Sequence, residues 1–339
     1  MKILFIGGTG TISSACAELA QAHGFELTLL NRGNRPPRPG TRQITADISN
    51  AAATAAALGN ERWDAVVDYI AFTLAELEQR IALFRGRTAQ FIFISSASAY
   101  QKPLASFPIT ESTPLVNPFW EYSRNKIACE DRLLRALREE NFPATIIRPS
   151  WTYDEKRITV PVNSPKSFTV ADRLRRGQPV IVPGDGTSLW TMTHNTDFAK
   201  GLVGLLGHRG AIGHTFHITS DEVLTWNQIY EAVAEAAGAP KPKLVHIASD
   251  FITACLPEFA AACTATRRIP RCSTTARSNI LCRTSSPPHA SATGWPAACN
   301  GLMPTRRGRR LTPWPMPPGT SSSTPTNEVW NRQKKEFGR

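Results

Sequence analysis

The sequence predicts an α/β protein with a doubly wound parallel sheet and a smaller C-terminal domain. Over the first 155 residues, short apolar runs alternate with amphipathic helical segments, a pattern typical of successive β–α–β units. A glycine-rich turn, GGTGTIS at residues 7–13, directly follows the first apolar run and opens the first helical segment. From about residue 156 the segments become shorter, which indicates a second domain.

Six strands and four helices are expected in residues 1–155. The first strand, Lys2–Ile6, is apolar and ends at the glycines, and the last helix begins shortly after Pro118, where proline suits a helix start. Right-handed crossovers would join these strands into one sheet of the Rossmann type. The other strands are expected at Glu26–Leu30, Arg42–Thr45, Ala65–Tyr69, Gln90–Ser95 and Ala144–Ile147, and the helices at Thr11–Ala22, Ala51–Ala57, Leu74–Phe84 and Glu121–Glu140.

Residues 156–261 are expected to form a smaller substrate-binding domain, some of whose segments join the first sheet. The loop Ile158–Ser167 leads into it, and a Gly184-Asp185-Gly186 turn lies near its middle. Helices are expected at Val170–Arg176, Thr196–Leu206 and Thr225–Ala237, and strands at Pro179–Val182, His214–Thr219 and Lys243–Ile247.

Residues 262–339 form a basic tail without helical or strand periodicity. They hold 13 Lys and Arg side chains and 2 acidic ones, so 11 of the net charge of +12 lies there. The high pI therefore reflects the tail and says little about residues 1–261. With freely chosen codons, the stretches Pro270–Cys282 and Arg307–Thr320 can both be re-read in one shifted frame as ordinary globular sequence. We interpret the tail as a frameshifted C-terminus in preference to a genuine disordered segment.

Several classes of protein are excluded by simple patterns. No run of about 20 apolar residues predicts a transmembrane helix, and the N-terminus lacks the pattern of a signal peptide, so a cytoplasmic protein is expected. The seven cysteines form no CxxC pair and no Cys/His spacing suited to zinc. Free thiols and no metal site are expected.

The glycine-rich turn is the first candidate binding motif. Glycine lets the backbone approach a pyrophosphate closely, and the amides at the start of the following helix meet its charge. Ser13 occupies the third glycine position, where a small side chain still permits close packing of helix and strand. These features predict a dinucleotide-binding loop.

The ends of the second and third strands supply the next candidates. Asn31-Arg32 stands where an acid would hydrogen-bond the ribose hydroxyls of NAD. Arg32 instead offers a cation to a 2′-phosphate, so NADP is favoured over NAD. Asp47 and Ile48 are candidates for contact with the adenine; alternatively, Asp47 is only the N-cap of the next helix.

A serine, a tyrosine and a lysine form the candidate catalytic set. Ser96 follows the fifth strand, where it can hydrogen-bond a substrate oxygen. Tyr122 and Lys126 are four residues apart, which places them on one helical face. A tyrosine is a poor acid or base at neutral pH unless a cation stabilises its phenolate, and Lys126 supplies that cation.

These motifs resemble the extended short-chain dehydrogenase/reductase superfamily, the NAD-dependent epimerase/dehydratase family. The resemblance covers residues 1 to about 255 and is carried by GGTGTIS, ISSASAY, YSRNK and Arg148-Pro149. It implies that Ser96, Tyr122 and Lys126 are catalytic. The cofactor-binding residues that it and the strand ends imply are Gly7, Thr9, Gly10, Thr11, Ile12, Asn31, Arg32, Asp47, Ile48, Ser95, Pro149 and Ser150.

Departures from the family pattern narrow the class of substrate that is expected. Ala97-Ser98 stand where sugar-nucleotide dehydratases have the Asp-Glu pair that removes water. Ser188 and Trp190 follow the glycine-aspartate-glycine turn where a Gln and a diphosphate-clamping Arg are typical. We therefore expect a substrate without a diphosphate, or one held elsewhere, by Arg148 or Lys156. Trp190 is expected in the core more than on a substrate ring.

The leading hypothesis is an NAD(P)-dependent oxidoreductase or epimerase acting on a carbinol or carbonyl carbon of a small, sugar-like substrate. The sequence leaves epimerisation and net redox open. One alternative is an RNA-binding module, because some relatives of this family use the Rossmann scaffold for RNA. Another is an inert chain whose substrate domain is disrupted by the tail. Family members often dimerise through the helix that bears the tyrosine, so a homodimer is an expectation; nucleic-acid and membrane partners are not expected.

Overall fold

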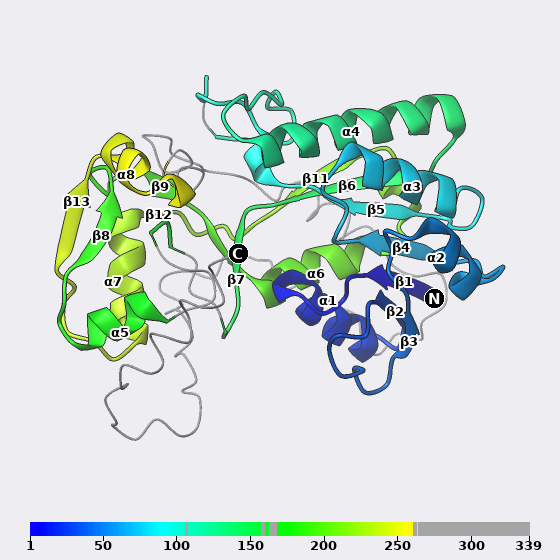
Figure 1. Cartoon of the computed structure of the whole chain (residues 1–339), viewed down its shortest axis with the longest axis horizontal. Coiled ribbons are helices and arrows are strands. Elements are labelled where there is room, and N and C mark those ends of the chain that lie inside the picture. The colour runs from blue at the N-terminus through cyan, green and yellow to red at the C-terminus, as the bar shows by residue number, and fades with distance from the viewer. Residues whose placement is uncertain (106–107, 157–159, 163–167, 260–262, 264–339) are drawn as a thin grey trace, which may run out of the picture.

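The computed structural model of the chain describes residues 1–105, 108–156, 160–162, 168–259 and 263. The predictions for the tail, residues 262–339, lie outside the described residues except at Cys263, and so does most of the loop Ile158–Ser167. Figure 1 shows a layered α/β part that contains the N-terminus and a smaller part built around α5, α7 and α8.

A seven-stranded parallel sheet forms the larger part, in the order β11-β6-β5-β4-β1-β2-β3. Its order reverses between β1 and β4, as in the doubly wound fold that the alternating pattern predicts. The six expected strands are all present, with ends that differ by at most two residues. The strands are β1 (Lys2–Ile6), β2 (Glu26–Asn31), β3 (Arg42–Thr45), β4 (Ala65–Asp68), β5 (Phe91–Ile94), β6 (Ala144–Pro149) and β11 (Thr215–Ile218).

Helices cover both faces of this sheet. On one face, α1 (Thr11–Ala22) and α6 (Asn195–Leu205) pack their apolar sides against β1, β2 and β11. On the other face lie α2 (Ala51–Leu58), α3 (Leu74–Phe84) and α4 (Glu121–Glu140), the last of which runs along the top of Figure 1. These two apolar layers bury both faces of the central strands.

The first helical turns show which side chains fix the helix starts. Asn50 caps α2 by accepting a hydrogen bond from the amide of Ala53. The alternative that Asp47 is the N-cap of α2 is therefore wrong. Thr73 and Glu76 form a capping box at the start of α3. These caps explain why the helices begin so close to the predicted residues.

The smaller part contains three two-stranded sheets and three helices. Its apolar core includes Trp190 and Trp226, which pack against each other and against Trp151. The strand pairs are β7 (Trp151–Tyr153) with β10 (Met192–His194), β8 (Val180–Pro183) with β13 (Leu244–Ile247), and β9 (Leu189–Trp190) with β12 (Leu224–Thr225); the helices are α5 (Thr169–Arg175), α7 (Trp226–Ala236) and α8 (Ser249–Cys255).

The chain crosses back from the smaller part to the large sheet. β11 pairs with β6, and the Asn195 side chain at the start of α6 donates a hydrogen bond of 3.0 Å to the carbonyl of Thr11 at the start of α1. The starts of these two helices are thus joined beside the glycine-rich loop. The short strands β7, β9, β10 and β12 have no counterpart in the sequence-based prediction, because two or three residues carry too little periodicity.

No helix in the described part of the chain is long and apolar enough to cross a membrane. No group of three His, Cys, Asp or Glu side chains in that part of the chain is arranged to hold a metal ion. The described cysteines at positions 16, 129, 255 and 263 are free thiols.

Candidate cofactor and catalytic site

The predicted site residues gather at the carboxyl edge of the sheet. The glycine-rich loop follows β1, the turn after Asp68 follows β4, and Ser95-Ser96 follow β5. β1 and β4 are the neighbouring strands at which the strand order reverses, the place where doubly wound sheets bind ligands. The fold therefore brings together residues that are up to about 140 positions apart in the chain.

The glycine-rich loop is tight because its neighbours leave no room for side chains. Gly7 has φ +88°, and a Cβ there would lie 2.6 Å from Ile70 Cγ2. A Cβ on Gly8 would lie 2.6 Å from Leu29 Cδ2. Ser13, which replaces the third glycine of the pattern, strengthens this loop: its Oγ accepts from the Gly10 amide at 2.8 Å and donates to the Gly7 carbonyl at 3.1 Å.

The start of α1 fits the pyrophosphate of a dinucleotide. No side chain caps this helix, and the first amides of a helix have no partner within it. The amides of Thr11 and Ile12 are therefore available to an anion, and the helix dipole favours negative charge there. Gly10 is exposed, and a Cβ built there would meet only Ser13 Oγ, at 3.5 Å, which leaves the mouth of the loop open.

At the ends of β2 and β3, the predicted residues surround an exposed cation. Asn31 Oδ1 accepts a hydrogen bond from the Gly33 amide at 2.9 Å, which folds the turn that carries exposed Arg32. Asp47 accepts from the amide and hydroxyl of Ser49. These hydrogen bonds, together with the positive charge of Arg32, lower the pKa of Asp47. An ionised Asp47 thus lies near Arg32.

Sequence reasoning missed Arg35. Its guanidinium donates a hydrogen bond to the carbonyl of Thr9, so it lies over the glycine-rich loop. Two arginines from the β2–β3 connection, Arg32 and Arg35, therefore stand at the same end of the site. The signal available in the sequence was a second cation in the same short connection, three residues after the first.

Ser96 and Tyr122 meet at the opening of the site. Ser96 Oγ accepts from the Ser98 amide at 3.1 Å and caps the short 3₁₀ helix η1 (Ala97–Ala99). Burial raises the pKa of Tyr122, and a hydrogen bond with Ser96 lowers it in part. The Tyr122 ring lies 4.7 Å from the ring of Trp120 and 6.2 Å from that of Phe72, measured between centroids. The phenol is therefore held between aromatic neighbours and a hydroxyl.

Lys126 is buried directly behind Tyr122. Its Nζ donates to the Ala71 carbonyl at 2.7 Å and to the Ile94 carbonyl at 2.8 Å, which uses two of its three hydrogens. Burial lowers the pKa of Lys126 to about 8. The ammonium lies 5.8 Å from the centroid of the Tyr122 ring, so the two predicted partners share one face of α4.

A second set of polar side chains lies beneath this pair. Glu130 is fully buried and accepts hydrogen bonds from Ser95 Oγ and from the Arg148 guanidinium, with Arg148 Nη2 at 2.5 Å. Arg148 also stacks 4.9 Å from the centroid of the Tyr100 ring. The expectation that Arg148 holds a substrate diphosphate is therefore wrong, because Glu130 neutralises the charge of Arg148 inside the protein. Ser95 points to Glu130, away from the open loop.

The remaining predicted residues lie at the border of the two parts. Pro149 is the last residue of β6 and is buried, and Ser150 Oγ donates to the Thr191 carbonyl at 3.2 Å. Trp190 is 2% exposed and belongs to the aromatic core, as expected, and Ser188 is buried beside it. Lys156 is exposed. His194 caps α6 through Thr196, a structural task.

The chain is similar in sequence to known proteins. Residues 80–219 match the model of the NAD dependent epimerase/dehydratase family. A chloroplast stem-loop binding protein of 41 kDa from Arabidopsis thaliana is 29% identical over 261 residues, 72% of this chain and 65% of that protein. The 2'-dehydrokanamycin reductase of Streptomyces kanamyceticus is 24% identical over 244 residues, 71% and 68% of the two chains. The chain thus spans about two thirds of the length of these relatives.

Solved structures share the fold. An epimerase from Methanothermobacter thermautotrophicus superposes with a TM-score of 0.68 at 15% identity, over 86% of this chain and 88% of that one. A UDP-glucuronic acid 4-epimerase from Bacillus cereus, solved with UDP-glucuronic acid and NAD, gives 0.64 at 18% identity, over 89% and 96%.

The match of residues 80–219, together with the fold, places the chain in the NAD-dependent epimerase/dehydratase family of the extended short-chain dehydrogenase/reductase superfamily.

Proposed function

We propose that this protein is an NAD(P)-dependent oxidoreductase or epimerase that acts on a carbinol or carbonyl carbon by Ser-Tyr-Lys chemistry. The observation that carries the proposal is the meeting of Ser96, Tyr122 and Lys126 at the carboxyl edge of the sheet, next to an open glycine-rich loop. Three side chains of these types serve no evident packing purpose together. They supply a hydrogen-bond donor, an acid/base and a cation at one place.

Each residue has a separate task in this proposal. A nicotinamide dinucleotide held at the glycine-rich loop would supply the hydride-transfer chemistry. Ser96 hydrogen-bonds the substrate oxygen, and Tyr122 gives that oxygen a proton in reduction or takes one in oxidation. Lys126, held by two carbonyls, presents positive charge to the phenol and so stabilises its ionised form. Return of the hydride to the opposite face would give epimerisation; release of the product would give net redox.

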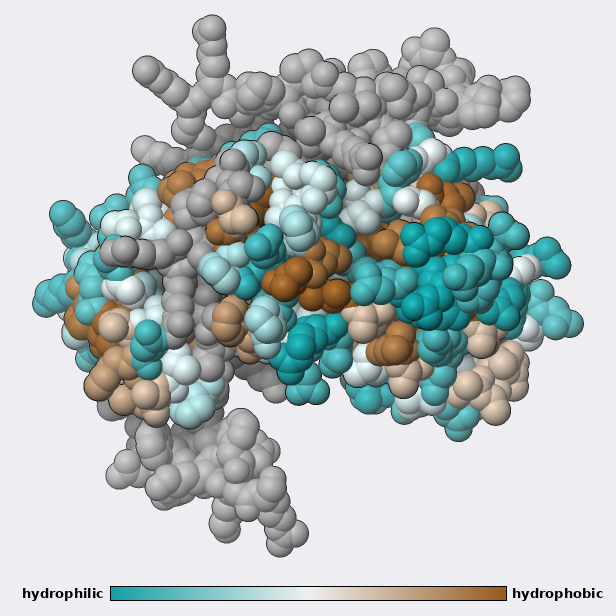
Figure 2. Space-filling model, turned by 90° about the horizontal axis from the view of Figure 1, so that it is seen from above, coloured by the Kyte–Doolittle hydropathy of each residue, from teal (hydrophilic) through white to brown (hydrophobic). Residues whose placement is uncertain are grey.

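The substrate is proposed to be small and without a diphosphate. Arg148 is paired with Glu130, and Trp190 is in the aromatic core, so neither of them supplies a phosphate clamp. Large hydrophobic side chains are instead exposed at the start of α4: Phe119 is 63% and Val116 is 52% exposed. The face seen in Figure 2, on the side where α4 lies in Figure 1, has a group of hydrophobic residues near its middle. A dehydro-sugar or another neutral ketone fits this chemistry.

NADP is the proposed cofactor in preference to NAD. No acid occupies the end of β2, and Arg32 and Arg35 place two cations beside the glycine-rich loop. A 2′-phosphate would neutralise them, whereas the two hydroxyls of NAD would not.

Tyr122→Phe tests the proposal. The full chain is incubated with NADPH and a panel of ketones that includes a 2'-dehydro-aminoglycoside and a UDP-4-ketosugar, and NADPH consumption is measured. We expect turnover with a diphosphate-free ketone and a loss of about 10²-fold or more in Tyr122→Phe, because the proton donor is removed. Tyr230→Phe is the matched control: this buried tyrosine donates to the Ile181 carbonyl in the smaller part. Equal turnover in Tyr122→Phe and wild type would refute the proposed chemistry.

A second candidate function is binding of a nucleic-acid stem-loop without turnover. It is favoured by the likeness to the Arabidopsis protein of that name and by the +11 charge of the tail. The discriminating measurement is binding of a stem-loop RNA to the full chain and to residues 1–261, with and without NADPH. Specific binding by the shorter chain, together with no cofactor binding, would favour this candidate over the enzyme.

A further inference from the structure

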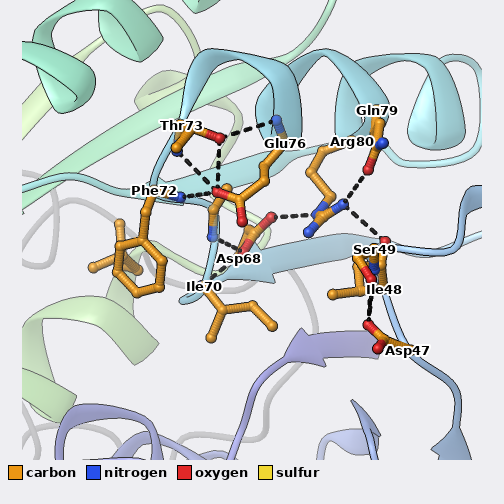
Figure 3. Close-up of polar contacts among 12 residues, drawn as sticks. Asp47, Ile48, Ser49, Asp68, Ile70, Phe72, Thr73, Glu76, Gln79 and Arg80 are labelled. Atoms are coloured by element: carbon orange, nitrogen blue, oxygen red, sulfur yellow. Dashed lines mark hydrogen bonds and ion pairs between the residues drawn. The ribbon is translucent and has the colours of Figure 1, made fainter. Parts of the chain in front are cut away.

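Asp68 and Arg80 form a buried ion pair that the proposed chemistry has not used. Asp68, at the end of β4, is 0% exposed, and Arg80, on α3, is 1% exposed. Arg80 Nε donates to Asp68 Oδ2 at 3.1 Å. Removing two charges from water costs several kcal/mol per ion and is often not repaid by their attraction. A pair of apolar side chains would fill the same space, so the location of the pair calls for an explanation (Figure 3).

The other oxygen of Asp68 shapes the turn after β4. Asp68 Oδ1 accepts hydrogen bonds from the amides of Ile70 and Ala71, at 2.8 and 2.9 Å. The Ala71 carbonyl then accepts from Lys126 Nζ at 2.7 Å. Asp68 therefore fixes the residue that holds the ammonium of Lys126. Because Ile70 also packs against Gly7, the same turn supports the glycine-rich loop.

Arg80 extends this support to the end of β3. Its Nη1 donates to the carbonyl of Ile48 at 3.1 Å, next to Asp47. Figure 3 shows Arg80 reaching from α3 between Asp68 on one side and Ile48 on the other. Ile48 is one of the two candidates, with Asp47, for contact with the adenine. One buried pair thus joins the proposed adenine end of the site to the lysine at its catalytic end.

Asp68 is also a negative charge close to Lys126. Asp68 raises the pKa of Lys126 and opposes the larger lowering that burial causes. Glu76 and Glu130, which face the same ammonium from α3 and α4, act in the same direction, as does Cys129. Burial in turn raises the pKa of Asp68, and Arg80 counters this rise. Arg80 therefore helps to keep Asp68 ionised.

We propose that Asp68 and Arg80 are positioning residues: they aim the Lys126 ammonium through the Ala71 carbonyl, keep it charged, and tie it to the Ile48 segment. The inference rests on the proposed function for its catalytic meaning, since Lys126 matters only if Tyr122 is an acid/base. The effect of Asp68 on Lys126 concerns this chain alone and can be measured without any turnover.

The test measures the pKa of Lys126 directly. The full chain is labelled with ¹³C at Cε of lysine, the signal of Lys126 is assigned with Lys126→Arg, and its titration is followed by NMR in wild type and in Asp68→Asn. Asparagine keeps an oxygen for the two amides and removes the charge. We expect the pKa of Lys126 to fall by about one pH unit. Glu78→Gln is the control, because Glu78 lies on the same helix but pairs with Arg132 at the surface; it should leave the titration unchanged.

Two further variants keep the test decisive. Arg80→Met should weaken NADPH binding, measured by fluorescence titration, about tenfold, because the Ile48 carbonyl loses its donor. If Asp68→Asn does not fold, the double variant Asp68→Asn/Arg80→Met, which leaves no unpaired buried charge, replaces it in the NMR titration. A folded protein with the charge of Asp68 removed and an unchanged Lys126 pKa overturns the inference. If wild type binds no cofactor, the proposed function fails, while the titration still decides the role of Asp68.

Discussion

At the scale of single residues, the site depends on how burial changes the pKa values of Tyr122 and Lys126. Tyr122 is partly buried, which raises its pKa, and Lys126 is almost fully buried, which lowers its pKa to about 8. Burial thus acts against both charged forms. Asp68 and the other negative charges nearby offset part of this effect for Lys126, and the hydrogen bond with Ser96 does so for Tyr122. At neutral pH Tyr122 is therefore protonated and Lys126 is charged.

The first prediction concerns the alkaline limit of activity. In the proposed function, protonated Lys126 is the form that stabilises the phenolate, so turnover should fall as pH rises through about 8. Lys126→Arg, whose guanidinium stays charged, should move this limit to higher pH. The measurement is kcat against pH for both proteins. A limit near 8 that persists in the arginine variant would assign it to another group.

Protein stability should change in the opposite direction over the same range. Between pH 8 and the ordinary value of 10.5, Lys126 has lost its proton in the folded state and keeps it in the unfolded state. The unfolded state then binds more protons, so the free energy of unfolding should rise with pH, relative to Lys126→Met. Denaturant unfolding at several pH values from 7 to 11 measures this difference.

The second prediction concerns the arginines beside the glycine-rich loop. Arg32→Ala and Arg35→Ala should each raise the Kd for NADPH about tenfold and change that for NADH little, because only NADPH carries the 2′-phosphate. Arg38→Ala is the control: it lies in the same connection but binds Gln21 and Glu18 on α1. Equal losses for both cofactors would assign the arginines to the pyrophosphate or to folding.

At the scale of elements, α4 presents two of the proposed catalytic residues on one face. Tyr122, Lys126 and Glu130 follow one another at intervals of four and point toward the sheet, where Glu130 meets Arg148 of β6. The ion pair joins α4 to β6. β6 lies next to β5, and Ser96 follows β5 in the chain. The position of the helix along the sheet is therefore fixed by a buried charge pair as well as by apolar packing.

The third prediction follows from that pair. Arg148→Met leaves Glu130 buried without its partner and should lower the free energy of unfolding by about 3–5 kcal/mol. Arg176→Met, which breaks the exposed pair with Asp172, should change it by less than about 1 kcal/mol. Urea unfolding measures both. A similar small change in the two variants would show that the buried pair contributes little to the position of α4.

At the scale of the whole molecule, the part with the seven-stranded sheet and the smaller part meet along the carboxyl edge of the sheet. β6 ends at Pro149 and the chain passes directly into β7, which pairs with β10 of the smaller part. The chain then returns through α6 and β11 (Figure 1). A substrate placed at Tyr122 would therefore lie between the part that carries the proposed cofactor site and the part with an aromatic core.

The sequence predicted the large sheet well because most of its strands are continuous apolar runs separated by turn residues and helices. Lys2–Ile6, Thr11–Ala22, Leu74–Phe84 and Glu121–Glu140 agree with the structure residue for residue. The short strands of the smaller part were missed because their pairing is set by distant segments. Asp68, Arg80 and Arg35 were missed for the same reason: their importance comes from partners that are distant in the chain, such as Ile48 and Thr9.

Hydride transfer is the central claim, and isotope transfer tests it most directly. The full chain is incubated with NADPH deuterated at C4 and with the diphosphate-free ketone that gives turnover, and the product is analysed by mass spectrometry. The proposed function predicts a mass increase of one at the carbinol carbon, in wild type and in Tyr230→Phe, and almost none in Tyr122→Phe. Binding of NADPH with no deuterium in any product of the panel would contradict it.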